Sequence, residues 1–183
     1  NTHQRRLVPG GLSKLPSPLE LETLKGKLTD SLEDLEEVVS FMKGVVSNLP
    51  DFRRETEFIS LNHDQRYPIY DGSLVSSDTG VASVEEYLSI TNEYVVPQST
   101  AKYTKHNRES YMTGALARLN NNYDNLRPEA KEIAEEFGLK PTCHDPFMNN
   151  VAQLVETAHC VVDALKIVNE LLDVVLESTP EYR

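Results

Sequence analysis

Apolar residues recur at steps of three and four along two long stretches, and this spacing predicts two long amphipathic helices. The first covers residues 18–49 and begins with a capping box between Ser17 and Glu20. The second covers residues 146–177 and begins after Asp145. The two apolar stripes are Leu21, Leu24, Leu28, Leu32, Leu35, Val38, Met42, Val45 and Leu49, and Met148, Val151, Val155, Ala158, Val162, Leu165, Val168, Leu172 and Val175. We expect the stripes to be buried against each other in antiparallel helices.

The stretch between these helices carries shorter elements. β-branched and aromatic residues are frequent in residues 58–77, and Asp71-Gly72 between short apolar runs predicts a β-hairpin there. Residues 84–138 return to helical spacing and end at Gly138, a typical C-cap. Residues 1–17 contain closely spaced Pro and Gly and are predicted to form a loop. The expected fold class is mainly α within α+β, with long antiparallel helices and a small β-hairpin region.

Composition narrows the class of protein. The chain has 183 residues, 39% hydrophobic and 26% charged, which suits one domain over residues 1–183. A net charge of −11 without a basic patch argues against nucleic acid as a partner. No stretch is apolar enough to span a membrane, and no export signal is visible. Two cysteines are too few for a disulfide framework, so we expect a reducing, cytoplasmic compartment.

Cysteine and histidine lie next to each other twice, at Cys143-His144 and at His159-Cys160, and both are metal ligands. Structural zinc sites bring ligands in pairs two to four residues apart, whereas here each Cys directly adjoins its His. On a helix His159 and Cys160 would point about 100° apart, so one ion could not easily take both. We therefore expect no metal site, and Cys160 to be a small buried apolar residue.

Two groups of acidic residues are candidates for function. Glu55, Glu57, His63 and Asp64 surround the predicted hairpin and could form an acid/base site, although surface polarity is the favoured interpretation. The other group lies on the polar face of the first helix and consists of Glu33, Asp34, Glu36 and Glu37. This group is typical of a solvated face, and the alternative is a docking surface for a basic partner.

Small residues at Gly114, Ala115 and Ala117 would let another backbone approach closely, and Arg118 follows them directly. One interpretation is tight helix packing with a surface arginine. The other is an arginine held at a packed seam, where it pairs with a carboxylate or an anion.

Four segments resemble motifs of the large subunits of nickel–iron hydrogenases, and they follow that family's order. The clearest is residues 110–120, which contain Gly-Ala-Leu-Ala-Arg-Leu-Asn as in the family's motif of that sequence. The others are His3 with Pro9-Gly10-Gly11, Ser99 with Ala101 and Lys102, and Asp145-Pro146-Phe147-Met148-Asn149-Asn150 with Glu156. They are most similar to the soluble cytoplasmic group, which couples hydrogen to nicotinamide, deazaflavin or sulfur reduction.

The resemblance implies a nickel–iron centre in the parent protein, with its ligands outside this chain. In the family, two Cys-x-x-Cys motifs, one near each end of the subunit, supply four thiolates to nickel. The iron shares two of them and also carries CO and cyanide. No Cys-x-x-Cys occurs in this sequence, so the motifs would lie upstream of His3 and beyond Tyr182. We expect the chain to be the central helical portion of such a subunit, with no metal ligand or bound cofactor of its own.

Partners and near-site residues also follow from the resemblance. The parent would split hydrogen heterolytically while a nearby base takes the proton. Electrons would leave through iron–sulfur clusters in a small subunit, and further electron-transfer subunits could follow. Arg118 and His3 are expected near the metal centre or the subunit interface, neither as a metal ligand.

Two positions depart from the family's pattern. Gln4 stands where the family usually has Pro, and Gln153 stands where it usually has Arg. Because the second change removes a charge next to Glu156, the resemblance does not carry an ion pair over to that glutamate.

Two other functions stay open. A non-catalytic helical interaction or scaffold module would dock a partner through the acidic face of the first helix. A related quinone-reductase subunit that has lost its cysteines is ranked lower, because Gly-Ala-Leu-Ala-Arg is intact.

Overall fold

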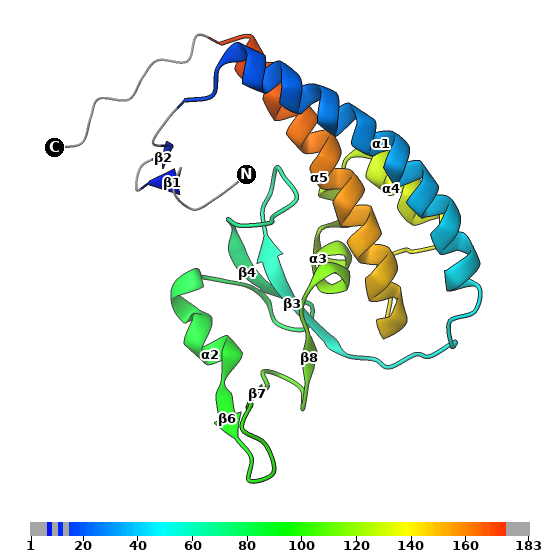
Figure 1. Cartoon of the computed structure of the whole chain (residues 1–183). Helices are drawn as coiled ribbons and strands as arrows, with labels where there is room; N and C mark the ends of the chain where they lie inside the picture. Colours follow the sequence, from blue (N-terminus) through cyan, green and yellow to red (C-terminus); the bar gives the residue numbers. More distant parts are fainter. Residues whose placement is uncertain (1–6, 9–10, 13–14, 175–183) are drawn as a thin grey trace, which may run out of the picture. The chain divides into compact units, whose positions relative to one another are not determined.

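The structure, a computed structural model, describes residues 7–8, 11–12 and 15–174, and Figure 1 shows the order of their elements. The chain forms two compact units. The first combines residues 1–36 with residues 160–183, and the second comprises residues 37–159. That residues 1–183 form a single domain stays a prediction.

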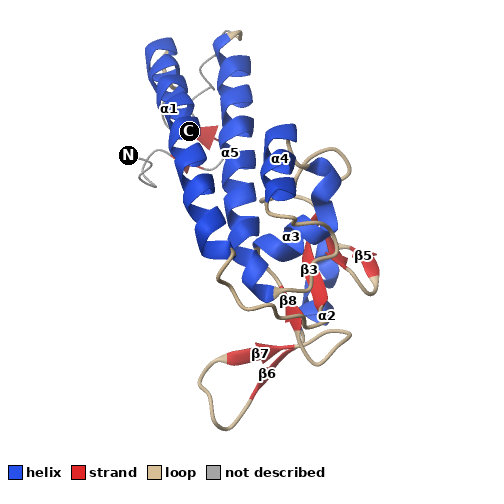
Figure 2. Cartoon of the chain, turned by 90° about the vertical axis from the view of Figure 1, so that its right-hand side faces the viewer, coloured by secondary structure: helices blue, strands red, loops and turns tan. Residues whose placement is uncertain are grey.

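In the first unit, two long helices meet. The N-terminal part of α1 (Pro18–Val46) runs antiparallel to the C-terminal part of α5 (Asn149–Leu172), as Figures 1 and 2 show. Leu21, Leu35 and Val168 of the predicted stripes are buried. The same unit contains the short antiparallel pair β1 (Leu7–Val8) and β2 (Gly11–Leu12), in a stretch predicted to be a loop.

The ends of α1 are fixed by side chains. The capping box is present: the Ser17 amide donates to Glu20 Oε2 at 2.8 Å, and the Glu20 amide donates to Ser17 Oγ at 3.2 Å. The helix ends short of the predicted residue 49. Ser47 Oγ and Asn48 Nδ2 both donate to the Gly44 carbonyl, at 2.9 and 2.7 Å, so side chains satisfy this carbonyl where the helix stops.

Helix α5 also begins later than predicted. A 3₁₀ turn, η4 (Pro146–Met148), precedes it, and the Asp145 side chain accepts from the Phe147 amide at 2.9 Å. The predicted end at residue 177 lies outside the described residues. In the second unit, Val151 and Val155 of the predicted stripe are fully buried.

A four-stranded sheet forms the centre of the second unit, in the order β5-β4-β3-β8. Strands β3 (Glu57–Asn62), β4 (Ser73–Ser76) and β5 (Gly80–Ala82) are antiparallel neighbours, and β8 (Tyr111–Met112) pairs parallel with β3. The β region predicted at 58–77 therefore exists, but it extends to a third antiparallel strand and to a distant one.

The predicted hairpin turn at Asp71-Gly72 is wrong. Residues 63–72 form a long connection between β3 and β4, and the tight turn lies between β4 and β5. The register pairs Asn62 with Ser73, so the chain passes close to Asn62 at Gly72. Gly72 has φ 147°, and a Cβ there would lie 2.4 Å from the Asn62 carbonyl oxygen. Glycine is needed for this approach rather than for a two-residue turn.

Helix α3 (Ala115–Asn122) packs on β3 (Figure 1), and asparagine side chains form hydrogen bonds between the two elements. Asn121 Nδ2 donates to the Phe58 carbonyl at 3.3 Å, and Asn122 Nδ2 donates to the Leu61 carbonyl at 2.9 Å. These bonds use carbonyls of a strand, and fully buried Leu116 and Leu119 lie on the same helix. The site residues of α3 are thus fixed to the sheet.

Residues 84–138 contain less helix than predicted. After the 3₁₀ turn η2 (Val84–Glu86), α2 (Tyr87–Thr91) stops at Asn92, which has φ 34°, and a separate hairpin of β6 (Glu93–Val95) and β7 (Lys102–Thr104) follows. Strand β8 replaces the expected start of a helix, and α3 begins only after Gly114.

Helix α4 ends as the sequence predicts. It runs over Pro128–Glu136, Gly138 has φ 65°, and the Leu139 amide donates to the Ala134 carbonyl at 2.8 Å. The fold class, mainly helical within α+β with a small sheet, is confirmed. Among the described residues, no helix is both long and apolar enough for a membrane span.

Candidate functional site

Arg118 is positioned by the start of α3. Gly114 precedes the helix with φ 92°, and Ala115 and Ala117 are buried. The Leu116 amide donates to Asn149 Oδ1 at 3.1 Å, so the first turn of α3 is bonded to the first residue of α5. The small residues thus lie where the start of α3 contacts the start of α5, and both interpretations of this segment required such a close contact.

The Arg118 guanidinium forms a two-point ion pair with Glu156 of α5. Arg118 Nε lies 2.6 Å from Glu156 Oε1, and Arg118 Nη2 lies 2.7 Å from Oε2. The side chain of Arg118 is 31% exposed and that of Glu156 is 11% exposed. The interpretation of an arginine that pairs with a carboxylate at a packed seam therefore describes this geometry.

Tyr67 completes the group from the connection between β3 and β4. Its hydroxyl donates to Glu156 Oε1 at 2.7 Å, and its ring lies 4.9 Å from the ring of His159 between centroids. The amide of Arg127 donates to His159 Nδ1 at 3.1 Å, which fixes that ring. We call Tyr67, Arg118 and Glu156 the Arg118 cluster.

Charge-assisted bonds decide the electrostatics of the Arg118 cluster. The hydrogen bond to Glu156 raises the pKa of Arg118, and this effect outweighs desolvation by burial. The side chain therefore stays a cation. Glu156 is ion-paired although Gln153 stands where the family has arginine, because its partner comes from α3 rather than from its own helix.

Glu57 is the centre of a second polar cluster, and its interpretation as a surface residue is wrong because it is 0% exposed. Ser76 Oγ donates to Glu57 Oε1 at 2.5 Å, and His106 Nδ1 lies 2.6 Å from the same oxygen. The amides of Asn107 and Arg108 donate to Oε2 at 3.1 and 3.4 Å. We call these residues the Glu57 cluster.

The carboxylate of Glu57 is stabilised by these donors. Burial raises the pKa of Glu57. The hydrogen bonds from Ser76 and His106 and the charge of His106 lower it, and together with the Asn107 amide they outweigh burial, so the pKa lies below the usual value. Next to the cluster, Arg108 Nε binds Asp78 Oδ2 at 2.6 Å. The hydrogen bond from Arg108 holds the pKa of Asp78 low.

The other acid/base candidates do not join Glu57. Glu55 and Asp64 are exposed, and His63 Nδ1 accepts from the nearby Gln65 amide, at 3.1 Å. No motif or spacing in the sequence marks Ser76, His106 or Tyr67 as members of these clusters. They lie 19 to 89 residues from their partners, so spacing along the chain carries no signal for them.

The Cys and His pairs have separate surroundings. Asn120 brackets Cys143 with two hydrogen bonds of 2.9 Å, and burial raises the pKa of the Cys143 thiol. His144 stacks on Phe58 with centroids 5.3 Å apart, while His159 contacts Tyr67. Cys160 is exposed, so its expected burial is wrong: it follows His159 by about 100° around α5 and lies off the apolar stripe.

Of the two remaining candidates, His3 and the acidic residues of α1, the structure describes only the acidic residues. His3 lies outside the described residues. Glu33, Asp34, Glu36 and Glu37 are all exposed on α1, as expected for a solvated face.

The Gly-Ala-Leu-Ala-Arg segment, which resembles the hydrogenase motif, opens a packed helix in a mainly helical α+β chain. No protein-family model matches the chain. Its sequence is 32% identical over 181 residues to sulfhydrogenase 1 subunit alpha of Pyrococcus furiosus.

This similarity covers 93% of the chain and 40% of the Pyrococcus protein. The chain therefore spans less than half the length of this curated relative. The resemblance to hydrogenase large subunits is confirmed, and the chain corresponds to part of this Pyrococcus alpha subunit.

Proposed function

We propose that the chain is the central helical domain of a nickel–iron hydrogenase large subunit, whose parent catalyses reversible oxidation of H2 and reduction of protons. The observation that carries this proposal is similarity to a hydrogenase alpha subunit along 93% of the chain. The Arg118 cluster supports it, because the arginine of the family's motif forms a partly buried ion pair with Glu156, which lies in another matching segment.

The nickel–iron centre would be bound by other parts of the parent. Among the described residues, no group of three or more His, Cys, Asp and Glu side chains could hold a metal ion. The full sequence has two cysteines, which cannot supply four thiolates. The residues present thus do not fit the centre, and this chain would serve to support and surround it.

For Arg118 we propose a position near the metal centre or the subunit interface. Bonds from two guanidinium nitrogens to Glu156, with Tyr67 on the same carboxylate, hold the cation in one orientation. A positioned cation of this kind can stabilise nearby negative charge. His3 is proposed for the same surroundings. A small subunit with iron–sulfur clusters would be the partner, with further electron-transfer subunits beyond it, in the cytoplasm.

Nickel binding tests the proposal. We expect the 183-residue chain, dialysed against Ni²⁺, to retain no stoichiometric nickel by atomic absorption, whereas the isolated parent protein retains it. A Cys143→Ser/Cys160→Ser double variant is the control and should match the unmodified chain. Tight, stoichiometric nickel on the unmodified chain that is lost in the double variant would contradict the proposal.

The second candidate is a scaffold that docks a basic partner, because four acidic residues of α1 are exposed. The parent reading frame separates the two functions. Cys-x-x-Cys motifs on both sides of the chain support the hydrogenase subunit. A frame without either motif would leave the scaffold.

A further inference from the structure

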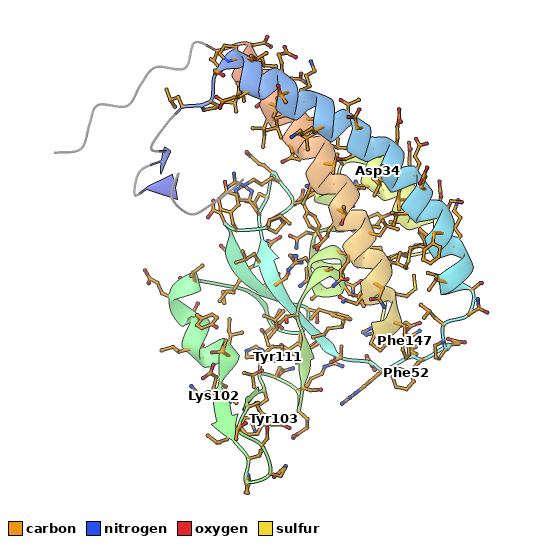
Figure 3. The ribbon with its side chains drawn as sticks, viewed as in Figure 1. Asp34, Phe52, Lys102, Tyr103, Tyr111 and Phe147 are labelled. Atoms are coloured by element: carbon orange, nitrogen blue, oxygen red, sulfur yellow. The ribbon has the colours of Figure 1, made fainter. Side chains whose placement is uncertain are left out.

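A cavity of about 300 Å³ lies in the second unit, apart from both polar clusters' charged groups. It opens where β3 and β8 begin. Its lining comes from the loop after α1, from both strands and from the segment before α5: Phe52, Arg54, Thr56, Phe58, Ser110, Tyr111, Met112, His144 and Pro146. Figure 3 labels Phe52 and Tyr111, and also Phe147, which follows Pro146 in the chain. We call it the Arg54 cavity.

Hydrogen bonds between distant segments hold the cavity open in one shape. The Arg54 amide donates to the His144 carbonyl at 3.1 Å, and the Thr56 amide donates to His144 Nδ1 at 3.4 Å. Thr56 Oγ1 donates to the Ser110 carbonyl at 3.5 Å. The buried Phe58 ring stacks on His144. The walls are thus fixed by three hydrogen bonds that each involve a backbone group, and by the stacked rings of Phe58 and His144.

The cavity has one cationic donor, Arg54, and its apolar surface is aromatic and aliphatic. Arg54 Nη2 donates to Ser110 Oγ at 3.3 Å, and no Asp or Glu lines the cavity. When its ring is neutral, His144 carries its hydrogen on Nε2, because Nδ1 accepts from Thr56. The cavity therefore combines an apolar surface with the guanidinium cation of Arg54 and an N–H donor on His144.

Arg54 differs from the other arginines whose partners the structure gives. Arg66, Arg108 and Arg118 each bind a carboxylate of the chain. Arg54 is exposed and its guanidinium bonds only to a neutral hydroxyl among the described residues. In a protein of net charge −11, a guanidinium without a carboxylate partner at the mouth of a cavity suits an acidic ligand.

We propose that the Arg54 cavity binds an apolar carboxylate, with its hydrocarbon or aromatic group between Phe52, Phe58 and Met112 and its carboxylate on Arg54. The volume lies at the lower end of ligand sites and suits a group the size of a phenyl ring with a short acid. Such a group can come from a free small acid or from a polypeptide in which Glu adjoins Phe. The proposal does not depend on the hydrogenase assignment.

Methionine-methyl NMR of the 183-residue chain tests the proposal, because the sequence has three methionines and only Met112 lines the cavity. Titration with 3-phenylpropionate should shift the Met112 methyl signal and leave those of Met42 and Met148 in place. The neutral 3-phenylpropanol should bind about tenfold more weakly, since it lacks the charge-assisted bond. Equal binding of acid and alcohol, or no shift at Met112, would overturn the proposal.

Arg54→Met should weaken 3-phenylpropionate binding about tenfold, while Arg53→Met, a neighbour outside the lining, should leave it unchanged. Equal loss in both variants would also overturn the site. A second arm uses the peptide acetyl-Gly-Phe-Glu-Gly-amide and its Gln counterpart. Tighter binding of the Glu peptide than of 3-phenylpropionate assigns a polypeptide source, and the reverse order assigns a free acid.

Discussion

Arg118 and Glu156 show how a single pair can be partly predictable. The small residues before Arg118 indicate a close contact, but 38 residues separate the two charges and nothing in the spacing names Glu156 as the partner. The absence of Arg at position 153 even pointed away from an ion pair at Glu156. A residue's type can be read as a charge or a donor, whereas its partner depends on the fold.

A double-mutant cycle on Arg118→Met and Glu156→Gln should give a coupling free energy of about 1–3 kcal/mol in urea unfolding, because both charges are largely shielded from water. The exposed pair of Arg66 and Asp71 is the matched control, with an expected coupling below about 1 kcal/mol. Equal coupling in the two cycles would show that the Arg118 cluster is no more rigid than a surface pair.

Glu57 predicts an acid dependence of stability. Its folded pKa is lowered, so it adds stability above its unfolded value of about 4.5, and this stability is lost as the pH falls toward the folded pKa. Glu57→Gln should cost about 1–3 kcal/mol of unfolding free energy at pH 7, because buried donors lose a charged acceptor. The difference from the unmodified chain should shrink below pH 4.5.

Glu55→Gln is the control for this measurement, since Glu55 is exposed two residues away. It should change the unfolding free energy little at any pH. A penalty for Glu57→Gln that stays constant from neutral to acid pH would contradict an ionised Glu57 in the folded chain.

Elements with strong local signals were the ones the sequence predicted well. The capping box at Ser17 and the glycine end of α4 depend on neighbours within one or two turns, and both are present. Short strands carried no such signal: β8 has two residues, and only its pairing with β3 defines it. The helical spacing predicted over residues 84–138 therefore suggested a helix where strand β8 is found.

The connection between β3 and β4 yields a prediction about the stability of this part of the sheet. Gly72→Ala should destabilise the chain by more than about 1 kcal/mol, because its φ of 147° is strained for Ala and its Cβ would meet the Asn62 carbonyl at 2.4 Å. Gly26→Ala in α1 is the matched control, with nothing within 4 Å of its Cβ. Helix propensity predicts that it stabilises by about 0.5–1 kcal/mol. Thermal unfolding of both variants decides between strain and a general effect of removing glycine.

At the scale of the whole molecule, the apolar stripe of an amphipathic helix predicts that one face of the helix is buried. The fold class followed from two such stripes and from the β region predicted at residues 58–77. What the stripes could not give is the division of each long helix between two compact units. Nor could they show that one sheet gathers strands from residues 57–112. Both results come from contacts between distant segments, which periodicity does not encode.

That division has a consequence for synthesis on the ribosome. The first unit needs residues up to 36 and residues from 160 onward, while the second is encoded between them. The second unit's sequence has therefore left the exit tunnel completely before the first unit's sequence is finished, and the N-terminal part of α1 waits more than a hundred residues for the segment of α5 that covers it. Until then the apolar stripe of α1 is accessible to water and to chaperones. The time for which it stays exposed depends on the number of residues between the two segments in the sequence, and not on the strength of any contact.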